Sequence, residues 1–231
     1  MFSCLNIVDA SNFTLDCDYS GSIVNKYQSS FSYCILLTEL PKLSKNNYSS
    51  FAYMFQGCTS LKRIPNNYLQ NSSKLYDNCY SHMFDGCTGL TTLPSGLLPA
   101  TTLESYCYSH MFDGCTGLTT LPYGLLPATT LASSCYQYMF NGCTGLVETP
   151  GGWILKAQTT ATYSCYAMFY GCSKLQKIAV SYSGIITASH WSSFLYNVSK
   201  KGTFYYSKNQ TKENIQSIVP SGWTLVQSKE W

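Results

Sequence analysis

One phrase occurs twice in this chain without change, and the distance between its copies constrains the fold more than any other feature. MFDGCTGLTTLP occupies residues 83–94 and returns at residues 111–122, a step of 28 residues. Looser copies begin at Ala52, Tyr138 and Ala167. A fixed period between about 20 and 50 residues is typical of stacked structural units that share one elongated core. We therefore expect a solenoid whose function lies on its surface and not in a closed pocket.

Composition narrows the classes of partner. Charged residues make up 11% of the chain and the formal net charge is +3, so we expect no basic stripe for nucleic acid. No apolar run is long enough to span a bilayer, and the first twenty residues lack a basic region followed by an apolar one. We expect no membrane insertion and no signal peptide. Polar coverage comes from Ser, Thr, Asn, Gly and 20 Tyr, a mixture also found in antibody binding surfaces.

Spacing within one unit predicts its secondary structure. Leu103, Cys107 and Met111 are four residues apart, the spacing of one helical face, and Gly114 suits a helix end. The LTTLP that follows is short, Thr-rich and ends in Pro, which favours a short extended piece. We therefore expect an α/β fold in which each unit is a short helix followed by a short strand.

The frame formed by Phe112, Cys115, Leu118, Leu121 and Pro122 resembles that of BspA-like leucine-rich repeats. The resemblance covers roughly residues 30–180 and is greatest to the 28-residue MFxGCTxLTxLP variant of gut and oral bacterial surface proteins and their phages. Residues 202–226 also resemble the tail that often ends such arrays. The resemblance implies a right-handed leucine-rich-repeat solenoid that binds host or partner surfaces, with no catalytic residues.

These observations predict three parts along the chain. Residues 1–30 form a degenerate N-terminal repeat or an attachment segment, residues 31–200 the solenoid, and residues 201–231 a C-terminal cap. The first part fits the repeat poorly, and the last leaves the pattern altogether.

Cysteines recur once per turn in two registers. The first series is accompanied by leucines three residues later, and we expect both to form the structural core: Cys58, Cys87, Cys115, Cys143, Cys172, Leu61, Leu90, Leu118, Leu146 and Leu175. The second series is Cys79, Cys107, Cys135 and Cys165. An unvarying step favours two ladders of buried free thiols, because cysteine packs as a small hydrophobe. Disulfides between adjacent turns are the alternative.

Metal binding and nucleophilic catalysis are two chemical alternatives. Cys79 with His82 and Cys107 with His110 could supply four zinc ligands, but the next units have Tyr138 and Met168 at the histidine position. A surface histidine is the simpler interpretation, and we expect no metal and no other cofactor. For nucleophilic catalysis, His190 is a candidate base beside the presumed cap, although a capping role is favoured. No phosphate-binding glycine motif is present, so we expect no enzyme.

Differences between the near-identical units mark the positions that packing leaves free. They place Tyr123, Tyr106, His110 and Tyr138 on the outside as candidate contact residues, with neutral drift as the alternative. A second candidate surface is the strip between the apolar residues of the extended pieces, where solenoids commonly bind partners. Its members are Lys62, Arg63, Thr91, Thr92, Thr119, Thr120, Val147, Glu148, Gln176 and Lys177.

The expected function is therefore a non-enzymatic surface recognition or adhesion module. The missing secretion pattern favours a phage virion-surface protein that decorates the particle or binds the host. A bacterial cell-surface or secreted adhesin is the first alternative, and a purely structural scaffold subunit is the second. The expected partners are a protein or glycan on a cell surface, or other virion subunits in an oligomer or larger assembly.

Overall fold

The computed structural model describes residues 6–15, 27–43, 50–70, 75–149, 161–182 and 186–229. Most of the expected N-terminal part, residues 1–5 and 16–26, lies outside the described residues. The fold is mixed α/β, with two small parallel sheets, β1-β2 and β3-β4-β5, and two short helices in the described ranges. The elements are β1 (Thr14–Leu15), β2 (Lys42–Leu43), β3 (Lys177–Val180), α1 (Ala188–Trp191), β4 (Gly202–Tyr206), α2 (Lys212–Gln216) and β5 (Trp223–Gln227).

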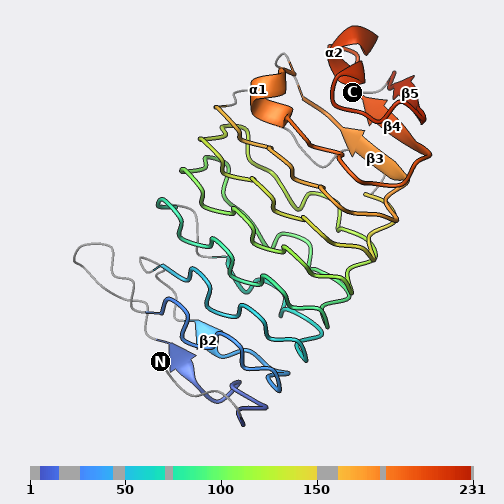
Figure 1. Cartoon of the computed structure of the whole chain (residues 1–231). Coiled ribbons are helices and arrows are strands. Elements are labelled where there is room, and N and C mark those ends of the chain that lie inside the picture. The colour runs from blue at the N-terminus through green and yellow to red at the C-terminus, as the bar shows by residue number, and fades with distance from the viewer. Residues whose placement is uncertain are drawn as a thin grey trace.

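Between β2 and β3 the successive repeats run side by side as irregular coils (Figure 1). Equivalent backbone hydrogen bonds recur between neighbouring copies: Phe84 N–H donates to Met111 O at 3.0 Å, and Phe112 N–H to Met139 O at 2.9 Å. The expected extended pieces meet only as single parallel bridges, such as Thr120 with Glu148, until β3 begins a regular sheet. Each copy is thus held by its neighbours and not by a sheet of its own.

The prediction of a short helix before each Gly-Cys pair is wrong. Residues 104–114 form consecutive tight turns, in which alternate N–H groups bond three residues back, as Met111 does to Tyr108 O at 3.2 Å. The remaining N–H groups bond to the next copy. Every fourth residue has a positive φ, 56° at Tyr106, 55° at His110 and 64° at Gly114, and a run of helix cannot pass through such residues.

Ladders of identical side chains fill the interior. The ten cysteines and leucines expected in the core, from Cys58 to Leu175, are each 0% exposed. Beside them the phenylalanine rings stack from copy to copy, with centroids 5.7 Å apart both for Phe84 and Phe112 and for Phe112 and Phe140. One core therefore continues through the repeats, and each ring is packed between two others.

Nine of the cysteines are free and buried, in both registers: Cys58, Cys79, Cys87, Cys107, Cys115, Cys135, Cys143, Cys165 and Cys172. In the first register each thiol donates to a carbonyl of the preceding copy, as Cys115 Sγ does to Phe84 O at 3.1 Å. Cys34, at the same register in the degenerate copy at residues 31–41, is disulfide-bonded and so departs from the ladder of free thiols. Burial raises the pKa of Cys79 to about 12 and that of Cys115 well above its ordinary value.

Each of the central copies has a second glycine, three residues after the one in its Gly-Cys pair. In the copy that contains Gly114 this residue is Gly117, which lies against the backbone of the preceding copy. A Cβ at Gly117 would lie 2.5 Å from both Leu90 O and Thr88 O. We expect Gly117→Ala to lower the free energy of unfolding by about 2–3 kcal/mol, because two carbonyls would have to move apart. Chemical denaturation measures this loss.

Gly124→Ala is the matched control, since nothing lies within 4 Å of the added carbon there. Its φ of +69° predicts a loss of about 1 kcal/mol from backbone strain alone. Equal losses for the two variants would show that the copies are not in close backbone contact at Gly117.

Candidate functional site

A row of stacked rings runs across successive copies on the outside of the coils. Ring centroids are 4.5 Å apart for Tyr53 and His82, 4.3 Å for His82 and His110, and 4.7 Å for His110 and Tyr138. All four residues have φ values of 54–59°, a left-handed conformation that is uncommon in residues other than glycine. This conformation recurs at one register, so the four side chains leave the backbone at equivalent places and align.

Carboxylates and amides form a second row three residues further along each copy. Asp85 Oδ2 lies 3.0 Å from His82 Nδ1 and accepts a hydrogen bond from Gln56 Nε2 at 3.0 Å. In the next copy the pattern repeats, with Asp113 Oδ2 lying 2.8 Å from His110 Nδ1. Asp113 Oδ1 also accepts from Asn141 Nδ2 at 2.8 Å. These bonds hold planar polar groups from neighbouring copies in fixed positions.

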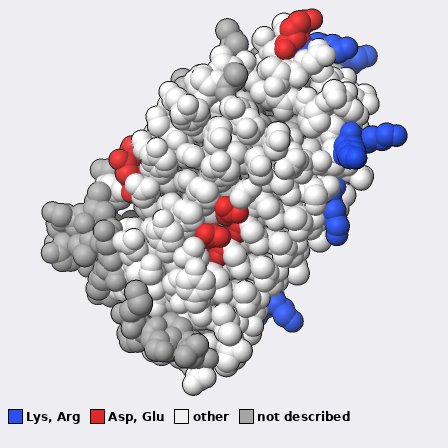
Figure 2. Space-filling model, in the orientation of Figure 1, with Lys and Arg blue, Asp and Glu red and all other residues white. Residues whose placement is uncertain are grey.

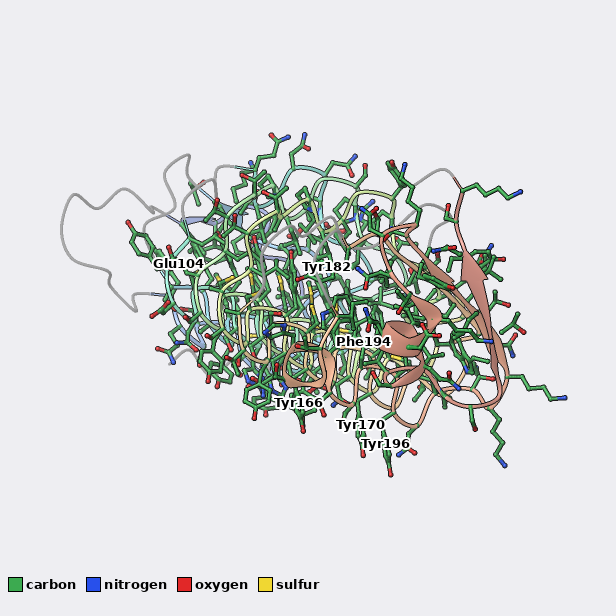
Figure 3. All side chains as sticks on the ribbon, turned by 90° about the horizontal axis from the view of Figure 1, so that it is seen from above. Glu104, Tyr166, Tyr170, Tyr182, Phe194 and Tyr196 are labelled. Atoms are coloured by element: carbon green, nitrogen blue, oxygen red, sulfur yellow. The ribbon has the colours of Figure 1, made fainter. Side chains whose placement is uncertain are left out.

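Five tyrosines gather at the C-terminal end of these rows. Tyr166 meets Tyr138 and Tyr163 edge to face at 5.3 Å and 5.5 Å, and Tyr170 stacks on Tyr196 at 5.1 Å. In Figure 3, which is seen from above, Tyr166, Tyr170 and Tyr196 project from the side that faces the viewer in Figure 1. Partial burial, a hydrogen bond with Tyr166 and nearby ionisable groups raise the pKa of Tyr138 to about 12.

The stacked row, the carboxylate–amide row and the tyrosine cluster together are called the outer face below. Figure 2 views the molecule from that side and shows acidic atoms in the middle, at the left margin and at the upper end, while basic atoms lie along the right edge and at the upper end. Residues 75–149 contain five acidic residues and neither Lys nor Arg: Asp77, Asp85, Glu104, Asp113 and Glu148. The central copies therefore carry a formal charge of −5 with neutral histidine.

The four contact residues that the sequence predicted lie in two kinds of environment. Tyr123 and Tyr106 are exposed, at 58% and 44%. His110 and Tyr138 are half-buried members of the stacked row. Tyr53, Asp85 and Asp113 were not singled out in the sequence analysis. A histidine three residues before an aspartate in both verbatim copies was the available signal.

In the predicted strip beside the leucines, hydrogen bonds join neighbouring extended pieces. Thr91 N–H donates to Lys62 O at 3.4 Å, and Gln176 N–H to Val147 O at 2.8 Å. Ion pairs stand at its two ends, with Arg63 3.1 Å from Glu39 and Lys177 3.6 Å from Glu148. The remaining members, Thr92, Thr119 and Thr120, are exposed between them. Exposed pairs of this kind contribute little to stability and leave the strip available to solvent.

The zinc alternative requires four side chains that the fold does not bring together. Cys79 and Cys107 are in the core, whereas His82 and His110 stack on the outer face against aspartates. Within the described ranges, no three potential metal ligands form a group. His190, the one candidate base of the sequence analysis, lies in α1 with its Nδ1 2.9 Å from Thr187 Oγ1.

Open hollows occur at the C-terminal end, one of about 350 Å³ lined by Lys212, Val219 and Trp223 among others. Its lining residues include one charged side chain, Lys212, and no histidine, cysteine or carboxylate. In the part of the chain that the structure describes, no helix has the length and apolar character needed to cross a membrane.

Comparison with known proteins adds no relative. No family model, no curated protein and no solved structure matches this chain. The outer face and the strip are therefore interpreted from their own chemistry.

Proposed function

We propose that the chain is a right-handed leucine-rich-repeat solenoid of the BspA-like kind that recognises a surface without catalysis. In this proposal it is a virion-surface component of a phage, which decorates the particle or touches the host. The placement on a phage is drawn from the resemblance of the repeat phrase to repeats of such proteins. A bacterial cell-surface adhesin would use the same surfaces in the same way.

The observation that carries the proposal is the contrast between the two sides of each copy. Inside, the same Cys, Leu and Phe recur at 0% exposure. Outside, one register holds Tyr53, His82, His110 and Tyr138 in successive copies. A stack that keeps its core constant while varying an aligned outer row has the organisation of repeat proteins that bind through an extended surface.

Binding of the labelled chain to a panel of gut and oral bacterial cells tests the proposal. We expect binding that falls at least tenfold when one of the two surfaces is altered, either by Tyr138→Ala with Tyr163→Ala or by Thr119→Ala with Thr120→Ala. Loss from the tyrosine pair would assign recognition to the outer face, and loss from the threonine pair to the strip. Thermal unfolding of each variant checks that the fold is retained.

A structural scaffold subunit predicts a different result. The chain would bind no cell in the panel and would be soluble only when produced together with a partner subunit. That outcome would contradict recognition, whereas cell binding that neither pair of substitutions changes would show that neither of the two surfaces carries it.

A further inference from the structure

We propose that the outer face binds an uncharged, hydroxyl-rich polysaccharide that lies across successive copies. This inference rests on the proposed function and adds the chemical class of the ligand. It depends on three features of the described residues: a free aromatic platform, a row of fixed planar hydrogen-bonding groups, and the charge of the central copies.

The aromatic platform is the stacked pair of Tyr170 and Tyr196. Tyr196 is the last ring of its row and is 55% exposed. In the stacked row the ring faces cover one another, so its rings offer edges and not faces to a ligand. The separate pair of Tyr170 and Tyr196 ends at Tyr196, whose outer ring face can receive the apolar C–H face of a sugar. A phenol ring supplies such contact area at small cost in conformational entropy.

Hydrogen bonding is provided by the carboxylate–amide row. Carboxylate and amide groups each present two polar atoms in one plane, which suits pairs of neighbouring hydroxyls. Asp85 and Asp113 are already oriented by His82, His110, Gln56 and Asn141, as described above. Groups that are ordered before binding lose little entropy when a ligand arrives, so the row is prepared for a rigid polar partner.

Charge excludes the anionic polymers. Two of the five acidic residues of the central copies, Asp85 and Asp113, lie on the outer face, and residues 75–149 contain neither Lys nor Arg. An anionic glycan or a nucleic acid would meet like charge along the middle of the face. A cationic ligand would have to compete with His82 and His110 for the carboxylates of Asp85 and Asp113, whereas a hydroxyl needs only a lone pair that their present bonds leave unused. An uncharged ligand meets neither obstacle.

A protein partner fits the face less well. The exposed large side chains among the residues of this face are tyrosines, Tyr163 and Tyr196. Protein interfaces usually have an apolar, fully desolvated centre that is depleted in charged residues. Here the centre is the carboxylate–amide row. From Tyr53 to Tyr196 the face spans six copies, about 24 Å at ~4.8 Å per step, so the periodic groups match a ligand that itself repeats.

Affinity gel electrophoresis tests the inference with mannan, galactomannan, xyloglucan and glycogen as neutral probes, and with dextran and dextran sulfate as a pair that differs in charge. We expect at least one neutral polysaccharide to retard the native chain and dextran sulfate to leave it unretarded at low salt. Tyr196→Ala should weaken that retardation at least tenfold. Tyr196→Phe should keep most of it, because the ring face is retained.

Phe13→Ala is the matched control, since Phe13 is an exposed ring of nearly equal exposure, 54%, beside β1. It should leave retardation unchanged. Retardation by dextran sulfate alone, by no probe at all, or equally in Tyr196→Ala and the native chain would overturn the inference.

Binding of the native chain to treated cells of the panel distinguishes failure of the polysaccharide inference from failure of the proposed function. Periodate oxidation of the cells should abolish binding, because it cleaves neighbouring hydroxyls of sugars, and protease treatment should not. If only protease treatment abolishes binding, the chain recognises cells but its ligand is a protein and not a polysaccharide. Cells that are not bound at all would refute recognition itself.

Discussion

Raising the pH above about 9 is expected to unfold this chain over a narrow range. Nine buried thiols are free, and burial raises the pKa of each, to about 12 for Cys58, Cys79, Cys165 and Cys172 and well above the ordinary value of 9.0 for the other five. The folded state therefore keeps protons that the unfolded state releases.

The direction follows from proton linkage. Between the unfolded pKa near 9 and the higher folded values, the unfolded chain binds fewer protons, so stability falls as pH rises. Each thiol contributes a loss of up to about 1.4 kcal/mol per pH unit in that window. Nine thiols acting together would exceed the 5–15 kcal/mol of a typical domain within roughly one to two pH units. Below pH 8 the same groups are neutral in both states and have no effect.

A pH titration under reducing conditions measures this, with tryptophan fluorescence reporting unfolding and ultraviolet absorbance reporting thiolate. The two signals should change together between about pH 9 and pH 11. At neutral pH a thiol reagent should find none of the nine cysteines in the native chain and at least nine after denaturation. Thiolate forming while the chain stays folded would contradict the buried ladders.

Phe112→Ala is expected to lower the free energy of unfolding by about 3–5 kcal/mol. Phe112 is 0% exposed and lies between Phe84 and Phe140, so its removal leaves a cavity and ends two ring stacks. Stacking contributes on the order of 0.5–1.5 kcal/mol per pair beyond burial. Urea denaturation of native and variant chains measures the difference.

Phe13→Ala removes the same side chain from an exposed position and should change stability by less than about 0.5 kcal/mol. In a stack where each copy contacts only its neighbours, the loss at Phe112 should also reduce the cooperativity of unfolding. A loss below about 1 kcal/mol for Phe112→Ala would mean that the phenylalanine ladder is not closely packed.

The repeat period and the core positions could be predicted from the sequence, because identical side chains at a constant step must face the same interior. The helix could not be excluded in the same way. Leu103, Cys107 and Met111 are four apart, and a ribbon of turns with a left-handed residue at every fourth position produces the same spacing as a helix. A helix and this ribbon of turns differ in the partners of their N–H groups, and the periodicity of the sequence carries no information about those partners.

The candidate site was only partly predictable for a related reason. Variation between copies was taken to mark exposed positions, yet Ser134, which replaces Tyr106 in the next copy, is 2% exposed. The pairing of His82 with Asp85 also depends on the turn that separates them, and the contact of Asp113 with Asn141 on the step between copies. Such contacts between neighbours in space appear only once the copies are stacked.

The hydrogen bonding of the turns has a consequence for how long such a molecule can be. Phe84 bonds forward to Met111 and Phe112 to Met139, so each copy presents to the next the same row of groups that it received from the one before. A whole copy can therefore be added or removed without changing what its neighbours bond to. Each added or removed copy would change the length of the molecule by about 4.8 Å. The outward side chains of each copy can differ without changing these backbone bonds.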